Sequence, residues 1–352
     1  MSAPPEGNPQ YDPVKEIEPH ILAQLDPEFV EYWTNAQRKG APNKEQFTIE
    51  ALRANPEKFA RPSAIDTKGF KGTLEKEVTS EDGAKVPVRV YYPDEAKHGP
   101  GPYPVHLNFH GGGFVVGDLT SDAGMNLRLV EAAGIAVVDV NYRHCPETLW
   151  GKCFQDAWAA LNWARDEAEA LNFRTDSFTA GGISAGGHIV LVLQHLARDA
   201  GFPLKAILPT VPPTTDLFLF KYYTVSPFAS FKEFYRGPVL PWAAIKWFGG
   251  LTMPEDKVAE LKSLWPDWYF SPLRAPNFKG LAPAFIRTGA CDMLRDEGEA
   301  YGHKLIAGGN KVTIKRYLGM PHTFARLEGL TQQAQYEVDT IEYLKDVHGI
   351  HQ

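Results

Sequence analysis

The sequence is poor in cysteine, in net positive charge and in long hydrophobic runs. Its 352 residues include only three cysteines, Cys145, Cys153 and Cys291, without metal-ligand spacing. An odd number of cysteines favours free thiols in a reducing compartment, so we predict a cytoplasmic location and no disulfide framework. With 36 basic against 43 acidic side chains and a formal net charge of −7, the chain lacks the basic excess that a nucleic-acid partner requires.

No segment approaches the roughly eighteen consecutive apolar residues of a membrane-spanning helix, so no membrane span is expected. The start of the chain, Met1–Asp12, is polar and rich in proline, with neither the basic nor the apolar region of a signal peptide. Hydrophobic residues make up 43% of the chain and charged residues 22%, which is typical of a globular protein.

From Val86 onward, apolar segments that favour strands alternate with segments of helical periodicity. The strands are expected at Val86–Tyr92, Tyr103–Phe109, Ile135–Asn141, Ser177–Gly181, Lys205–Val211, Ala284–Thr288 and Val312–Tyr317. The helices are expected at Ala123–Ala133, Lys152–Asn172, Ser184–Ala200, Asp296–Ala307 and Thr331–His348. Such alternation predicts an α/β fold with a mostly parallel central sheet and helices on both faces.

Two further helices are expected before the first strand. Asp26 followed by Pro27 has the pattern of a helix start, and Gly40 is expected to end this helix. The second helix is predicted at Lys44–Asn55, before Pro56.

The interval from Val211 to Asn277 interrupts the alternation and is rich in aromatic residues. Between Phe218 and Phe248, eleven of 31 residues are aromatic, against 12% in the whole chain. Some of these rings are expected to fill a core. An aromatic insertion after a strand of the sheet is also what a lid over an apolar pocket requires.

Two glycine-rich motifs carry the chemical information in this chain. Gly182–Gly186 reads Gly-Ile-Ser-Ala-Gly, the G-x-S-x-G pattern of a nucleophile elbow that presents Ser184 between a strand and a helix. His110–Gly113 reads His-Gly-Gly-Gly, a loop whose backbone N–H groups can complete an oxyanion hole. Both motifs follow predicted strands, where reactive sites of α/β sheets lie. Together they predict a serine hydrolase.

A serine nucleophile needs a histidine base and a carboxylate that orients it, and in α/β hydrolases these follow in the order serine, acid, histidine. Asp292 lies just beyond the strand Ala284–Thr288, and His322 follows the strand Val312–Tyr317. Asp296 and Glu297 are instead interpreted as first-turn acids that stabilise a helix N-terminus.

The remaining histidines fit this chemistry less well. His188 and His195 lie on the helix after the serine and are expected to pack or to face solvent. His348 lies near the C-terminus, where fraying is expected. His106 and His110 lie four apart on a strand and its end, so they do not form a helical metal pair, and we predict no metal and no cofactor.

The chain resembles the hormone-sensitive-lipase-like esterases of the α/β-hydrolase superfamily. The motifs that carry the resemblance are Phe109–Phe114, Asn141–Glu147 (Asn-Tyr-Arg-His-Cys-Pro-Glu), Gly182–Gly187, Asp292–Gly298 (Asp-Met-Leu-Arg-Asp-Glu-Gly) and Met320–Phe324. The resemblance implies the α/β-hydrolase fold over about Val86–His348. It implies Ser184 as the nucleophile, Asp292 as the acid and His322 as the base. The N–H groups of Gly111, Gly112 and Ala185 would form the oxyanion hole. The supporting motif residues would be His110, Gly113, Gly182 and Gly186.

The resemblance also implies a cap built from N-terminal helices and a mid-chain insertion. We therefore expect an N-terminal cap segment at 1–75, a hydrolase core at 76–210, a cap insertion at 211–277 and the rest of the core at 278–352. Family members are often homodimers. Ile183 stands where they usually carry Asp or Thr, and Thr323 replaces a glycine after the base; Ile183 leaves the subgroup and the dimer open.

The expected activity is hydrolysis of small to medium, apolar or aromatic carboxylic esters through an acyl-enzyme, so the expected partner is a small-molecule ester. The same triad can serve acyl transfer, lactonisation or amide cleavage, because water and other nucleophiles attack the same acyl-enzyme. A ligand-binding homologue without catalysis is a further alternative.

Overall fold

The computed structural model of the protein describes residues 13–38, 48–54, 70 and 72–351. Its centre is a single eight-stranded sheet with the strand order β1-β2-β4-β3-β5-β6-β7-β8. The strands are β1 (Thr73–Thr79), β2 (Lys85–Tyr91), β3 (Tyr103–Phe109), β4 (Ala136–Val140), β5 (Phe173–Ile183), β6 (Ala206–Thr210), β7 (Ala284–Gly289) and β8 (Val312–Tyr317). Within the described part of the chain, no helix combines the length and the apolarity needed to cross a bilayer.

The sheet is antiparallel only where β2 pairs with β1 and with β4, and it is parallel from β4 to β8. Every residue of β3, β4, β6 and β7 is buried. Strands that are buried along their whole length fit a sheet that helices cover on both faces. The predicted α/β class is therefore confirmed.

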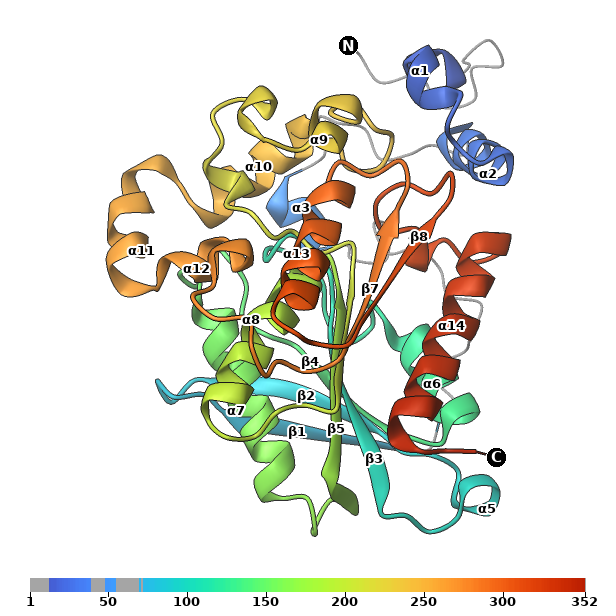
Figure 1. Ribbon diagram of the computed structural model, residues 1–352, viewed down its shortest axis with the longest axis vertical. Helices are drawn as coiled ribbons and strands as arrows, with labels where there is room; N and C mark the ends of the chain where they lie inside the picture. Colours follow the sequence, from blue (N-terminus) through green and yellow to red (C-terminus); the bar gives the residue numbers. More distant parts are fainter. Residues whose placement is uncertain (1–12, 39–47, 55–69, 71, 352) are drawn as a thin grey trace.

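Helices cover both faces of the sheet (Figure 1). On one face α6 (Ala123–Ala133) packs against α14 (Thr331–His348). On the other face α7 (Lys152–Asp166) and α8 (Ala185–Asp199) pack together, and α13 (Arg295–Ala307) joins the same apolar core. Because parallel strands end at one edge, the loops after β3, β5, β7 and β8 converge there.

Near the N-terminus, a short α1 (Pro19–Leu22) precedes α2 (Pro27–Arg38). Asp26 accepts a hydrogen bond from the Glu28 N–H at 2.8 Å, which caps the predicted start of α2. Of the helix predicted at 44–55, the structure describes α3 (Ile49–Ala54). Gly40 and Pro56 lie outside the described residues.

Three local expectations were wrong. Strand β1 was not expected, because its exposed, charged residues lack an apolar run. Helix α7 ends at Asp166 rather than Asn172, since the chain turns there and Phe173 donates to the Ala168 carbonyl at 2.7 Å. His348 does not fray: its ring is buried and lies 2.8 Å from the Ser177 hydroxyl on β5.

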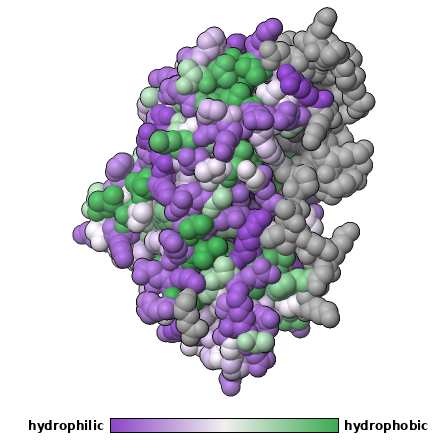
Figure 2. Space-filling view, turned by 90° about the vertical axis from the view of Figure 1, so that its right-hand side faces the viewer, coloured by the Kyte–Doolittle hydropathy of each residue, from purple (hydrophilic) through white to green (hydrophobic). Residues whose placement is uncertain are grey.

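The segment of residues 211–277 contains short helices outside the sheet, at the upper left of Figure 1. They include α9 (Ala229–Glu233), α10 (Trp242–Thr252), α11 (Val258–Leu264) and α12 (Asp267–Phe270). The face that Figure 2 shows is mostly hydrophilic, with separate hydrophobic patches between polar side chains. Residues 211–277 are called the 211–277 segment below.

Candidate active site

Ser184 lies at a sharp turn between β5 and α8. Its φ of 55° is in the left-handed region, which non-glycine residues rarely adopt. The turn is held by a hydrogen bond from the Ser184 N–H to the Thr210 carbonyl at 2.9 Å. A Cβ on Gly186 would overlap the Phe109 carbonyl, and one on Gly182 would overlap Gly186. Both glycines are therefore needed for this close passage of backbones.

The loops that carry Asp292 and His322 follow the neighbouring parallel strands β7 and β8. The Cys291 N–H donates to the Met320 carbonyl at 2.9 Å, which ties one loop to the other. A Cβ on Gly289 would meet the Met320 carbonyl at 2.6 Å, so the loops also pass too closely for a side chain there. Backbone contacts thus help to bring the two loops together.

The structure brings the three predicted side chains into one chain of hydrogen bonds. His322 Nε2 lies 2.9 Å from Ser184 Oγ, and His322 Nδ1 lies 2.8 Å from Asp292 Oδ2. The other carboxylate oxygen of Asp292 accepts the Leu294 N–H at 3.0 Å. Asp292 and His322 are buried, while Ser184 is partly exposed. The carboxylate can hold the imidazole with its free nitrogen toward the serine hydroxyl.

The glycine loop after β3 lies directly against the elbow. A Cβ on Gly111 would meet the Ile183 carbonyl at 2.8 Å, and Gly112 and Gly113 have φ values of 147° and 61°. Among the described residues, the N–H groups of Gly111 and Gly112 have no hydrogen-bond acceptor. Ala185 is the first residue of α8, where N–H groups have no intrahelical partner. Unpaired donors therefore lie on both sides of Ser184.

His110 is buried beneath this loop. Its ring stacks on Tyr142 with centroids 4.5 Å apart, and the Tyr142 hydroxyl donates to the His110 carbonyl at 2.8 Å. His110 Nδ1 lies 3.1 Å from the Gly111 carbonyl. Burial lowers the pKa of His110, so its ring is neutral near pH 7. These contacts hold the glycine loop against the core.

A contact from the N-terminal part of the chain was not expected. Arg53 on α3 donates from Nη2 to the carbonyls of Val115 at 3.0 Å and Cys145 at 2.7 Å, and it pairs with Glu147. Arg53 therefore joins the loop after β3 to the loop after β4. No sequence motif marks an arginine that binds carbonyls so far along the chain.

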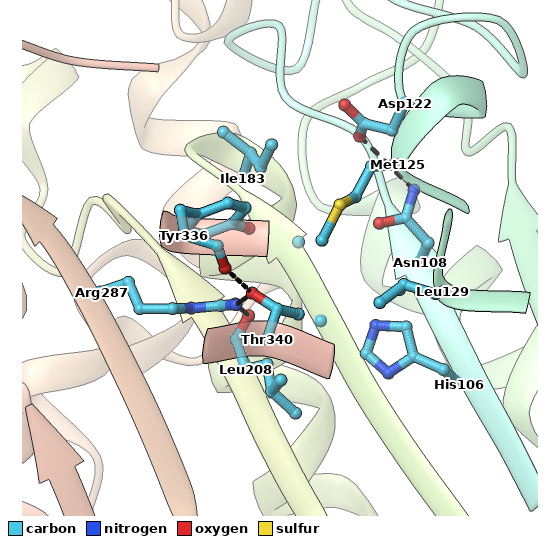
Figure 3. A pocket seen from close by; sticks show the side chains of 12 residues that line it. His106, Asn108, Asp122, Met125, Leu129, Ile183, Leu208, Arg287, Tyr336 and Thr340 are labelled. Carbon is cyan, nitrogen blue, oxygen red and sulfur yellow. Dashed lines mark hydrogen bonds between the residues drawn. The ribbon is translucent and has the colours of Figure 1, made fainter. Parts of the chain in front are cut away.

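Ile183 lines a small cavity between the sheet and helices α6 and α14 (Figure 3). Arg287 of β7 lines the same cavity and donates to the Thr340 hydroxyl at 2.8 Å. The Tyr336 ring lies 4.9 Å from the Arg287 guanidinium. An apolar side chain at position 183 thus lines the same cavity as the buried Arg287.

Asp296 and Glu297 lie in the first turn of α13, as predicted, but they do more than stabilise a helix end. The Asp296 carboxylate accepts the Ser230 N–H at 2.8 Å. Glu297 is fully buried and accepts the N–H groups of Thr214 at 2.7 Å and Thr215 at 3.3 Å. Burial raises the pKa of Glu297 to about 7, although its hydrogen bonds oppose that rise. Both carboxylates therefore connect α13, the helix that follows the loop of Asp292, to the 211–277 segment.

The other two histidines near the elbow are structural. His188 Nε2 lies 2.7 Å from the Tyr269 carbonyl, and His195 Nε2 lies 2.9 Å from the Tyr301 hydroxyl. Burial lowers the pKa of each to about 4. Both rings are neutral and packed, and neither contacts the serine hydroxyl.

The sequence profile of a family described as having the alpha/beta hydrolase fold matches residues 106–326 of this chain. The matched region contains the glycine loop, the elbow and the loops of Asp292 and His322. The chain belongs to this family of α/β hydrolases.

Similar proteins identify the branch of the family. Carboxylesterase NlhH of Mycobacterium tuberculosis is 34% identical over 71% of this chain and 75% of its own length. A thermostable esterase from Pseudomonas putida has a TM-score of 0.77 at 28% identity, over 94% of this chain and 98% of that chain. A hyperthermophilic esterase from Pyrobaculum calidifontis also has a TM-score of 0.77, at 27% identity, over 92% and 98% of the two chains. The resemblance to hormone-sensitive-lipase-like esterases is thereby confirmed.

Proposed function

We propose that this chain is a serine carboxylesterase that hydrolyses small to medium, apolar or aromatic esters. The observation that carries the proposal is the hydrogen-bonded series Ser184–His322–Asp292, with distances of 2.9 Å and 2.8 Å. An alcohol side chain becomes a useful nucleophile when an oriented base takes its proton. The esterase names of the similar proteins support the same activity.

In the acylation step, Ser184 Oγ attacks the ester carbonyl carbon while His322 Nε2 accepts the hydroxyl proton. The tetrahedral intermediate then collapses, and His322 returns the proton to the leaving alcohol. Asp292 keeps the Nδ1–H tautomer in place and stabilises the imidazolium that forms. Water attacks the resulting acyl-enzyme with the same base, releases the acid and restores the serine.

The N–H groups of Gly111, Gly112 and Ala185 are the proposed oxyanion hole. They flank Ser184, and the donors on the glycine loop have no acceptor within the described chain, so they are free to bind the charged oxygen. Each such donor contributes on the order of 3 kcal/mol of transition-state stabilisation.

The proposed substrate range depends on aromatic contacts above the glycine loop. A Cβ on Gly113 would overlap the ring of Phe248 from α10, so this ring lies against the loop. Phe114 meets Phe218 edge to face with centroids 6.2 Å apart. Aromatic walls beside the oxyanion donors favour apolar or aromatic acyl groups of limited size.

We further propose that residues 211–277 and the N-terminal segment 1–75 form a cap over the core regions 76–210 and 278–352. Gln24 donates to the Glu233 carboxylate at 3.0 Å, and Glu18 pairs with Arg236 at 3.0 Å. These contacts join the two segments and support the proposal.

A cytoplasmic location is proposed because all three cysteines are free and buried. The homodimer that the family resemblance implies is tested by light scattering during gel filtration. A mass near the 39.1 kDa of one chain would exclude the dimer.

Replacing Ser184 by alanine tests the proposed activity. Hydrolysis of p-nitrophenyl acetate is expected to fall by a factor of order 10⁶, because the acyl-enzyme cannot form. Ser263→Ala on α11, far along the chain from the motifs, is the matched control and keeps the parent rate. Comparable activity in the two variants would contradict the mechanism.

A further inference from the structure

The 211–277 segment leaves the sheet after β6 and returns to it before β7. Its outgoing connection (residues 211–216) and its returning connection (residues 269–275) are joined at Thr214. The Ser271 hydroxyl donates to the Thr214 carbonyl at 3.0 Å. The Leu273 N–H donates to the same oxygen at 3.2 Å. A displacement of one connection therefore moves the other as well.

Glu297 of α13 holds the outgoing connection from below. Besides the two N–H groups it accepts, its Oε2 accepts the Thr215 hydroxyl at 2.7 Å. In return, the Thr214 hydroxyl donates to the Glu297 carbonyl at 2.8 Å. No lysine, arginine or histidine among the described residues forms an ion pair with Glu297. A buried carboxylate without a cation is costly, and these donors are what compensates for it.

His188 of α8 holds the returning connection. Its Nε2 donates to the Tyr269 carbonyl at 2.7 Å, and the ring also interacts with the Pro213 carbonyl of the outgoing connection. The imidazole packs on Phe154, with centroids 5.7 Å apart, and edge-on against Phe114 at 5.6 Å. The His188 ring thus contacts both connections on one side. On the other side it contacts Phe114, next to the glycine loop.

Glu297 and His188, which we call the clamp, lie on the two helices that start at the triad loops. Helix α8 begins immediately after Ser184, and the His188 N–H donates to the Ser184 carbonyl at 3.0 Å. Helix α13 begins three residues after Asp292. Neither Glu297 nor His188 contacts the serine hydroxyl or His322, so neither takes part in the chemistry.

We propose that Glu297 and His188 are positioning residues that hold both connections of the cap against the triad-bearing helices and thereby limit the size of the acyl group. This inference rests on the proposed esterase function. When the clamp is intact, the aromatic residues of the cap stay close to the glycine loop. When it is loosened, the cap moves away while the triad and its donors keep their places.

The test compares Glu297→Ala, which removes every side-chain acceptor, with Glu297→Gln, which keeps one carbonyl oxygen. Glu299→Ala is the matched control on the same helix, since Glu299 contacts Thr288 and Arg316 instead of the cap. Hydrogen exchange is followed at residues 211–216 and 269–275. Values of kcat and KM are measured with p-nitrophenyl acetate and p-nitrophenyl benzoate.

We expect Glu297→Ala to speed exchange in both connections by about tenfold or more, since buried N–H groups lose their acceptors. The benzoate-to-acetate ratio of kcat/KM should rise about tenfold, mainly through KM, with smaller effects in Glu297→Gln. A merely structural role would lower stability without changing this ratio.

The outcomes separate the two proposals. A parent enzyme that hydrolyses neither ester would overturn the proposed function, whatever the exchange data show. An active parent whose Glu297→Ala variant matches Glu299→Ala in exchange and ester ratio would overturn the inference alone. If Glu297→Ala does not fold, Thr215→Val removes one donor of the same clamp and must change the ratio in the same direction.

Discussion

The triad loops and the 211–277 segment are held in place by different means. The triad loops are set by backbone geometry: Ser184 by its positive φ, and the loops of Asp292 and His322 by a backbone hydrogen bond between Cys291 and Met320. The 211–277 segment is held by side chains, namely aromatic rings and the buried Glu297. The difference indicates that chemistry is built into the sheet edge, while substrate selection lies in contacts that single substitutions can alter.

Substitution of Asp292 by asparagine tests the triad loops. We expect it to have the largest effect of the variants described below. The amide would favour the wrong imidazole tautomer, so kcat should fall about 10⁴-fold, as with the corresponding change in serine proteases. The rate is measured with p-nitrophenyl acetate. Asp296→Asn, in the first turn of α13 and without contact to His322, should keep most of kcat, and equal losses would contradict the assigned roles.

Gly112→Ala perturbs the backbone of the glycine loop beside the triad. Gly112 has a φ of 147°, and an added Cβ would overlap the Val116 carbonyl, so the N–H must move. Loss of one oxyanion donor is expected to lower kcat by about 10²–10³ with little change in KM. Gly250→Ala on α10, where an added Cβ meets nothing within 4 Å, is the control. A normal kcat in Gly112→Ala would exclude this N–H from the oxyanion hole.

Phe248→Ala tests the 211–277 segment, which side chains hold in place. Removing the ring that lies on Gly113 should raise kcat/KM for p-nitrophenyl benzoate relative to the acetate by about tenfold. Leu264→Ala, at an exposed residue of the same segment, should leave that ratio unchanged. An unchanged ratio in both variants would place the acyl group elsewhere.

The last prediction concerns pH and stability in the core. Burial raises the pKa of Asp139 on β4 from 3.8 to about 8, although Asn108 donates to it at 2.8 Å. The folded protein therefore holds a proton that the unfolded chain releases, a stabilising contribution present below about pH 4 and lost as pH rises through about 8. Asp139→Asn should flatten the fall of the unfolding free energy between these values, by up to about 1.4 kcal/mol per pH unit. Asp166→Asn on the surface should leave this pH dependence unchanged. The unfolding free energy of each variant is measured by urea denaturation at several pH values.

The sequence predicted the sheet edge well because its signals are local. Strands β3 and β8 and helices α6 and α14 have the predicted bounds. Ser184, Asp292 and His322 were identified from short motifs and their order. Each motif describes a backbone turn that depends on its own few residues.

Contacts between distant segments were not predictable in this way. Glu297 has the local pattern of an ordinary first-turn acid, and its burial depends on Thr214 and Thr215, more than 80 residues earlier. Arg53 likewise binds carbonyls of Val115 and Cys145 that no periodicity connects to it. The charged edge strand β1 was missed because strand formation there depends on pairing with β2 rather than on apolar residues.

The most direct measurement of the central claim is peptide mass spectrometry after a fluorophosphonate probe has reacted with the intact protein. We predict one adduct, on the peptide that contains Ser184, and loss of labelling in His322→Ala, because the hydroxyl then has no base. An unlabelled protein, or an adduct on another serine, would contradict the assignment of Ser184 as the nucleophile.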